Sequence, residues 1–170
     1  MTVSSEKGKG SEFTIYLPRI CDDVEDLDNE EINSLKGENL CVLIDDDVAM
    51  HDLVKRTIKK AGLTLLGATN GEQGLNMIRE VKPKLILLDV LMPGRDGWSI
   101  LKECKSDKSI KDIPVIMVSQ MSQESLAFSL GADDYLTKPI ERNKFLKIVK
   151  KFVGSNLSLI HISEPTRLDD

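Results

Sequence analysis

Six residues that can take part in metal or phosphate chemistry follow apolar runs in this sequence. They are Asp45, Asp46 and Asp47 after LCVLI, Asp89 after LILL, Ser119 after VIMV, and Lys138 just past Tyr135–Leu136. Carboxylate oxygens suit a hard cation such as Mg²⁺, lysine supplies a fixed positive charge, and serine donates a hydrogen bond. Carboxylates placed close together repel one another unless a cation lies among them. A nucleophilic carboxylate, a metal ion, a lysine and a hydroxyl are the groups that phosphoryl transfer uses.

Five apolar runs, each followed by a stretch of helical period, predict how these residues are positioned. The runs are residues 40–44, 63–68, 85–88, 115–118 and 135–136. Because they are uninterrupted rather than alternating, we expect an α/β fold with a parallel sheet covered by helices on both faces. In the doubly wound, flavodoxin-like strand order 2-1-3-4-5, the first and third strands are neighbours. Asp45, Asp46 and Asp89 would then face one another at the switch point of the sheet.

The composition fits one ordinary domain with appendages. The chain has 170 residues, of which 41% are hydrophobic and 30% charged, and its net charge of -5 argues against a nucleic-acid surface. No stretch has the pattern of a secretory signal or of a membrane span. Cys21, Cys41 and Cys104 lack the spacing of a zinc site or a disulfide framework, and Cys41 is expected to be a core residue. We therefore expect a cytoplasmic location without membrane contact by this fragment.

Four blocks of the sequence resemble, in order, the receiver domain of bacterial two-component response regulators. The resemblance covers Leu40 to about Val153, and the blocks are VLIDDD, LILLDVLMPGRDGW, IPVIMVS and GADDYLTKPI. It implies a phosphoacceptor signalling domain rather than an enzyme. Its partners would be the phosphohistidine domain of a histidine kinase and a downstream histidine phosphotransfer protein or output domain.

The resemblance also implies a phosphoacceptor and a metal site. Asp89 would accept the phosphoryl group from a phosphohistidine. Asp46 and Asp89 would bind Mg²⁺ through their carboxylates, Asp45 largely through water, and Leu91 through its backbone carbonyl.

The remaining roles that the resemblance implies concern the phosphoryl group and the response to it. Ser119 would hydrogen-bond a phosphoryl oxygen, and Lys138 would pair with the same group ahead of a cis bond to Pro139. Tyr135 would be the switch that turns inward when Ser119 is drawn to the phosphate. Two departures from many receivers are the short Ser119–Lys138 spacing, which predicts a short fourth helix or leading loop, and Gln120 where a small alanine is common.

The segments outside residues 40–153 are expected to have other origins. Residues 1–18 resemble the end of a histidine kinase ATP-binding domain, with Gly8, Gly10, Ser11 and Phe13 in its last block, but without the earlier nucleotide-binding boxes. Residues 19–39 are interpreted as an acidic linker. Residues 154–170 are interpreted as a disordered tail. Within it, residues 157–167 match the translation of a sequencing adapter, and 157–170 are interpreted as a cloning scar. The predicted parent is a hybrid histidine kinase, which could itself be attached to a membrane.

Two other functions use a similar set of residues. A haloacid-dehalogenase-like phosphatase also has a strand-end aspartate nucleophile with magnesium, but it needs an acidic pair after the lysine, whereas Asp133 and Asp134 precede Lys138. A receiver-like module that only binds partners would gain nothing from packed acids.

Three features near the predicted site have simpler interpretations. Asp47 is expected to be a helix N-cap or a solvated neighbour of the site. His51 is expected on the exposed start of the first helix, in a surface role. The lysines of the last helix are expected to form a solvated face.

Overall fold

The computed structural model describes residues 2–6, 10–14 and 39–154. The predicted tail from residue 155 on, the cloning scar and all but the last residue of the predicted linker lie outside these residues, as does Cys21. Near the N-terminus, β1 (Thr2–Glu6) pairs antiparallel with β2 (Gly10–Thr14). The predicted strand in SEFTIYLP thus overlaps β2.

The main domain alternates strands and helices, as the five apolar runs predicted. Its elements are β3 (Leu40–Ile44), α2 (Val48–Lys59), β4 (Thr64–Ala68), α3 (Gly71–Val81), β5 (Leu85–Asp89), α4 (Gly97–Ser106), β6 (Val115–Ser119), α5 (Glu124–Ser129), β7 (Asp134–Thr137) and α6 (Arg142–Val153). The strands form one parallel sheet in the order β4-β3-β5-β6-β7. Counted along this domain, the order is 2-1-3-4-5, so the predicted fold class is confirmed.

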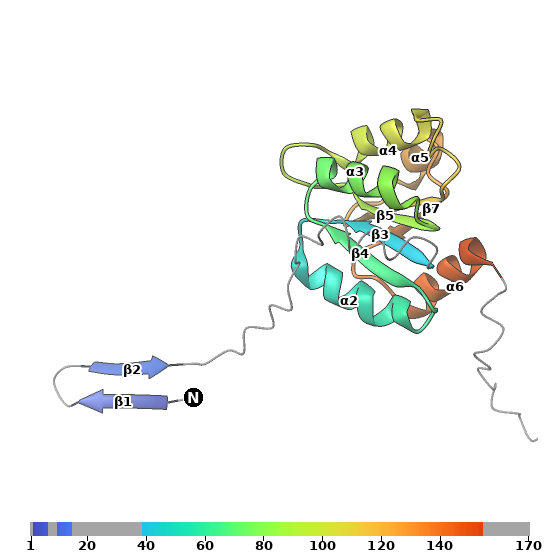
Figure 1. The fold of residues 1–170 in the computed structure, drawn as a ribbon. Helices are drawn as coiled ribbons and strands as arrows, with labels where there is room; N and C mark the ends of the chain where they lie inside the picture. The colour runs from blue at the N-terminus through green and yellow to red at the C-terminus, as the bar shows by residue number, and fades with distance from the viewer. Residues whose placement is uncertain (1, 7–9, 15–38, 155–170) are drawn as a thin grey trace, which may run out of the picture.

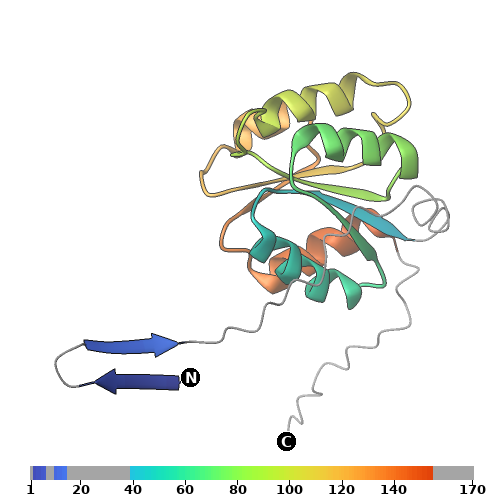
Figure 2. The ribbon, with the colours of Figure 1, turned by 60° about the vertical axis from the view of Figure 1, so that its left-hand side comes forward.

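Helices cover both faces of the sheet, which explains the uninterrupted apolar strands. In Figures 1 and 2, α3, α4 and α5 lie on one side of the sheet and α2 and α6 on the other. Successive strand residues point to opposite faces, so Val42 packs with the core under α3 and α4, whereas Leu43 packs with the core under α2 and α6. Every residue of β3, β5 and β6 is buried. Cys41 is fully buried in β3, which confirms its predicted core position.

The helix ends agree with the local sequence. The Asp47 carboxylate accepts a hydrogen bond from the Ala49 amide, so its predicted role as N-cap of α2 is confirmed. The helix α5 has 6 residues, which confirms the short fourth helix expected from the Ser119–Lys138 spacing.

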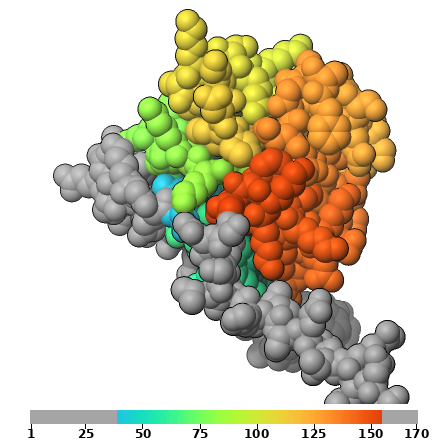
Figure 3. All heavy atoms as spheres, turned by 90° about the vertical axis from the view of Figure 1, so that its right-hand side faces the viewer, coloured from blue at the N-terminus to red at the C-terminus, as the bar shows by residue number. Residues whose placement is uncertain are grey.

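Figure 3 shows the face of the molecule where α6, in red, adjoins the orange surface of the segment that precedes it.

Candidate functional site

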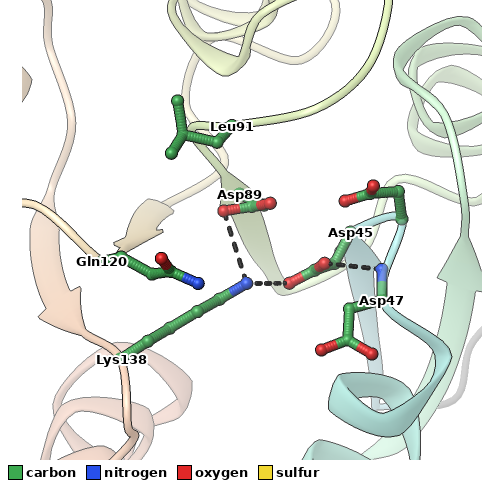
Figure 4. Close-up of a pocket in the computed structure, with 7 residues that line it drawn as sticks. Asp45, Asp47, Asp89, Leu91, Gln120 and Lys138 are labelled. Atoms are coloured by element: carbon green, nitrogen blue, oxygen red, sulfur yellow. Dashed lines mark hydrogen bonds and ion pairs between the residues drawn. The ribbon is translucent and has the colours of Figure 1, made fainter.

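A pocket lies at the carboxyl edge of the sheet, where parallel strands present their terminal residues. Its volume is about 260 Å³, and Figure 4 shows side chains from separate strand ends converging on it. The residues that line it are Asp45, Asp46, Asp47, Asp89, Leu91, Gln120 and Lys138. The chain thus gathers at one place the acidic residues and the lysine that the sequence predicted.

Lys138 reaches from the end of β7 into the acids at the centre of this pocket. Its Nζ lies 2.8 Å from Asp45 Oδ2 and 3.5 Å from Asp89 Oδ1 (Figure 4). Burial by itself lowers the pKa of Lys138, but the hydrogen bond to Asp45 and the charges of both aspartates outweigh burial, so the pKa is raised. The lysine therefore stays charged and holds two carboxylates at close range.

For Asp89, burial outweighs the ion pair with Lys138, because this carboxyl also lies beside another acid. Burial raises the pKa of the Asp89 carboxyl, and the charge of Asp45 raises it further. Lys138 and the Leu91 amide act in the other direction without cancelling these two effects. The pocket therefore carries more negative charge than Lys138 alone can balance, and a further cation would relieve the excess.

The acids are arranged so that such a cation fits. Asp45, Asp46 and Asp89 each offer a carboxylate oxygen, and the three oxygens lie within 4.8 Å of one another. Asp45 and Asp89 are buried whereas Asp46 is exposed, so one side of the cluster is open to water. Carboxylate oxygens with room for retained waters are the surroundings that Mg²⁺ prefers in proteins. The donor set thus fits this ion.

The loop after Asp89 depends on glycine at a close approach of two backbones. A Cβ atom at Gly97 would lie 2.1 Å from the carbonyl oxygen of Asp89. The Gly97 amide also donates to the Val90 carbonyl at 3.0 Å. The start of α4 is therefore held against the end of β5. This close approach explains why the PGRDG turn between them ends in a glycine. Leu91, in the same loop, exposes 55% of its surface.

Ser119 and Tyr135, the two predicted switch residues, meet at the backbone of Met121. Ser119 is fully buried, and its hydroxyl oxygen accepts a hydrogen bond from the Met121 amide at 3.1 Å. The Tyr135 hydroxyl donates to the Met121 carbonyl and accepts from the Gln123 amide at 3.3 Å. Ser119 does not line the pocket, whereas the next residue, Gln120, does. The Tyr135 side chain is buried.

The Lys138–Pro139 peptide bond is cis, as the resemblance implied.

The prediction that His51 is exposed was wrong. His51 is buried, with 7% of its surface exposed, and its Nε2 lies 2.7 Å from the Asp45 carbonyl oxygen. The sequence did carry a signal for this burial, because His51 precedes Val54 by three residues and Ile58 by seven, and both are core residues of α2. A second signal was Gly67, because a glycine inside an apolar strand indicates that another group packs closely against the backbone there, and in this structure that group is the His51 ring.

Comparison with known proteins agrees with this fold and pocket. Among curated proteins, the DNA-binding dual master transcriptional regulator RpaA of Synechocystis is 36% identical over 112 residues, which are 64% of this chain and 46% of that protein. The chain thus spans less than half the length of this relative. The solved receiver domain of a DNA-binding response regulator from Colwellia psychrerythraea is 26% identical, with a TM-score of 0.64, over 68% of this chain and 98% of that one.

A second solved structure shows the same fold at lower identity. The receiver domain of a sensor histidine kinase from Pseudomonas aeruginosa is 21% identical, with a TM-score of 0.63, over 69% of this chain and 99% of that one. That protein has a magnesium ion coordinated in its active-site cleft.

The fold is a doubly wound α/β domain, and its pocket is an acidic site whose carboxylates could hold a cation. The family model described as the response regulator receiver domain matches residues 41–150. The chain belongs to this family, the receiver domains of two-component systems. These domains bind Mg²⁺ in their acidic site and interact with histidine kinases and phosphotransfer or output partners. Within residues 2–6, 10–14 and 39–154, no helix is both long and apolar enough to cross a membrane.

Proposed function

We propose that Asp89 is the residue of this receiver that takes the phosphoryl group from a phosphohistidine. The observation that carries the proposal is the position of Lys138 Nζ, within 3.5 Å of both Asp45 and Asp89 in a pocket at the switch point of the sheet. Asp89 is the last residue of β5 and pairs with Val118 of β6, and its carboxylate faces Lys138 (Figure 4). A nucleophile and a fixed cation are thus already in place for an anionic group.

The transfer is a single displacement at phosphorus. A carboxylate oxygen of Asp89 attacks in line, and the P–O bond forms while the P–N bond to the donor imidazole breaks. The leaving nitrogen keeps the electron pair of that bond. Lys138 pairs with the phosphoryl oxygens, and Ser119 donates a hydrogen bond to one of them once its hydroxyl turns from Met121.

The cation of the site is Mg²⁺ in this proposal. Asp46 and Asp89 would hold it through carboxylate oxygens, Asp45 largely through water, and Leu91 through its backbone carbonyl. Bound there, the ion supplies positive charge that lets the carboxylates and the phosphoryl oxygens share one pocket. The support for this set is the closeness of the three carboxylate oxygens and the openness of the cluster on the side of Asp46.

The response to phosphorylation passes through Ser119 and Tyr135. Both side chains are hydrogen-bonded to the backbone of Met121. When Ser119 turns to the phosphoryl group, the Met121 amide loses that bond, and the loop between β6 and α5 is free to move. Tyr135, which is bonded to the same peptide segment, links this loop to β7 and so to the surface that partners read.

We also propose a hybrid histidine kinase as the parent, located in the cytoplasm or attached to its membrane. The support is the GKGSEF pattern of residues 8–13 ahead of a receiver, with the acidic residues 19–39 as the linker between two domains and residues 40–153 as the receiver. In this proposal residues 154–170 are a tail, and 157–170 do not belong to the natural protein. The sequence of the natural gene on both sides of this chain tests these assignments directly.

Labelling with a small phosphodonor tests the central assignment. The protein is incubated with acetyl phosphate and MgCl₂, and its intact mass is measured. We expect one alkali-labile phosphoryl group on the wild type and none on Asp89→Asn, with labelling abolished by EDTA. Asp112→Asn, at an exposed aspartate of the described chain, is the matched control and should label normally.

Each alternative result contradicts the proposal in a different way. Labelling of Asp89→Asn at the wild-type rate would place the acceptor elsewhere. Repeated hydrolysis of a small phosphomonoester would indicate a phosphatase. The absence of any label, including from a phosphorylated kinase, would indicate a module that only binds partners.

A further inference from the structure

A buried histidine lies directly behind the acidic pocket. His51 projects from the first turns of α2, and its Nε2 lies 2.7 Å from the carbonyl oxygen of Asp45. A carbonyl oxygen can only accept, so Nε2 must carry the proton in this hydrogen bond. The ring is thus a donor to the residue whose carboxylate binds Lys138.

The place of the ring is prepared by a glycine in the neighbouring strand. A Cβ atom at Gly67, in β4, would lie 2.2 Å from Nδ1 and 2.8 Å from Cε1 of His51. No real side chain could share that space with the imidazole in this position. Gly67 pairs with Leu43 across β3 and β4, close to the point where β3 gives way to Asp45. The fold therefore holds the ring between α2 and the edge strand.

This hydrogen bond completes a set of contacts on every polar group of Asp45. The Asp45 amide donates to the Ala68 carbonyl at 3.0 Å, and its Oδ1 accepts from the Asp47 amide at 2.9 Å. Its Oδ2 accepts from Lys138, and its carbonyl accepts from His51. The carbonyl of Asp45 belongs to the peptide that joins it to Asp46. Fixing that carbonyl therefore fixes the peptide from which both acidic side chains depart.

We propose that His51 is a positioning residue of the pocket, which orients the Asp45–Asp46 peptide and thereby the two carboxylates that face the cation. The proposal rests on the proposed function, because it assumes that these carboxylates serve a metal ion and Asp89. It differs from core packing in one respect. A packing role depends on the volume of residue 51, whereas a positioning role depends on its N–H donor.

Two substitutions separate the donor from the volume. His51→Gln keeps a side-chain N–H at a reach similar to that of Nε2, and His51→Leu fills much of the same space without a donor. Mg²⁺ affinity is measured on the unphosphorylated 170-residue chain by calorimetric titration, and the initial rate of labelling by acetyl phosphate is measured at saturating Mg²⁺. The melting temperature of each variant is recorded alongside.

We expect His51→Leu to weaken Mg²⁺ binding by about tenfold, as loss of a partner behind a metal ligand commonly does, and His51→Gln to recover most of that loss. If the leucine variant does not fold, His51→Asn replaces it, because its amide is one atom too short to reach the carbonyl. Equal Mg²⁺ affinities and labelling rates in His51→Gln and in the variant that cannot donate to the Asp45 carbonyl would overturn the proposal, whatever their melting temperatures.

The same experiment distinguishes this failure from failure of the proposed function. If wild-type protein binds Mg²⁺ and labels at Asp89 while all His51 variants do so equally, only the positioning role is wrong. If the wild type neither binds Mg²⁺ nor accepts a phosphoryl group, the function proposed for the pocket is wrong, and the positioning proposal fails with it.

Discussion

The acidic pocket and a surface cluster on α3 and α4 combine the same kinds of charged group in opposite surroundings. In the surface cluster, Arg79 Nη2 lies 2.8 Å from Glu103 Oε1, and Arg79 Nε lies 3.0 Å from Asp107 Oδ2. Arg95, from the loop after Asp89, pairs with the other oxygen of Glu103. These side chains stay 25% to 45% exposed, whereas the Asp45 side chain in the pocket is completely buried.

The two clusters shift their acids in opposite directions. Burial, then the charge of Asp45, raises the pKa of Asp89. The pKa of Asp107 is lowered to about 2, first by hydrogen bonds from Ser109 and then by Arg79. On the surface each acid is bonded to a nearby donor, whereas in the pocket the buried Asp45 and Asp89 share Lys138. The proposed metal ion and phosphoryl group would use this imbalance of charge.

The largest expected effect comes from removing the cation of the pocket. Lys138→Met leaves the buried Asp45 without its partner and next to Asp89. We expect the free energy of unfolding of metal-free protein at pH 7 to fall by about 3 kcal/mol, as for other broken buried ion pairs. Saturating Mg²⁺ should restore part of the loss, because the ion supplies positive charge. Urea denaturation with EDTA or with MgCl₂ measures both values, and a loss that Mg²⁺ leaves unchanged would argue against repulsion as its cause.

The second expected effect is that replacing Asp89 or Asp107 by asparagine changes the stability at pH 7 in opposite directions. Because the folded-state pKa of Asp89 is raised, its native carboxyl binds protons more readily than in the unfolded chain, and stability is lost as pH rises through that pKa. Asp89→Asn should therefore raise the stability of metal-free protein at pH 7, and this gain should vanish in acid.

Asp107 should behave in the opposite way. Its lowered pKa contributes stability above the ordinary value of 3.8, and that stability is lost as pH falls toward about 2. Asp107→Asn should therefore destabilise the protein at pH 7 and have less effect in acid. Urea midpoints of both variants and the wild type across this pH range check the pair, and parallel curves for the two variants would show that burial does not set the sign.

The smallest expected effect comes from the surface cluster. Arg79→Met removes one positive charge, as Lys138→Met does, but its partners remain in water. We expect the free energy of unfolding to change by less than about 1 kcal/mol, and the change to shrink in high salt. Phosphoryl labelling should stay at the wild-type rate. A loss as large as that of Lys138→Met would remove the distinction between the two clusters.

Much of the fold and of the candidate site could be predicted from local patterns in the chain. The uninterrupted apolar runs correspond to β3, β5 and β6, which are buried on both faces. Where a run stopped at a polar residue, the strand ended within a residue of that point, as at Asp89. These patterns suffice because strand burial and helical period are properties of short segments.

Contacts between side chains could be predicted from the sequence less well. The exposed position predicted for His51 was wrong, because the space for its ring is made by Gly67 in a neighbouring strand, which the helical pattern of α2 does not contain. The Arg79–Glu103 pair joins two helices whose packing no local signal specifies. The hydrogen bonds of Ser119 and Tyr135 to Met121 likewise depend on how one loop folds over β6 and β7.

The amino-acid sequence by itself determined which residues stand at the ends of the strands, since hydrophobic periodicity is written into consecutive positions. Only the tertiary structure decided which of them touch. Lys138 and Asp45 are 93 positions apart and meet at 2.8 Å because the order of the strands brings their carboxyl ends to one edge. Burial at that edge then sets the balance of charge, because a carboxylate withdrawn from water depends on the few cations that the fold places beside it.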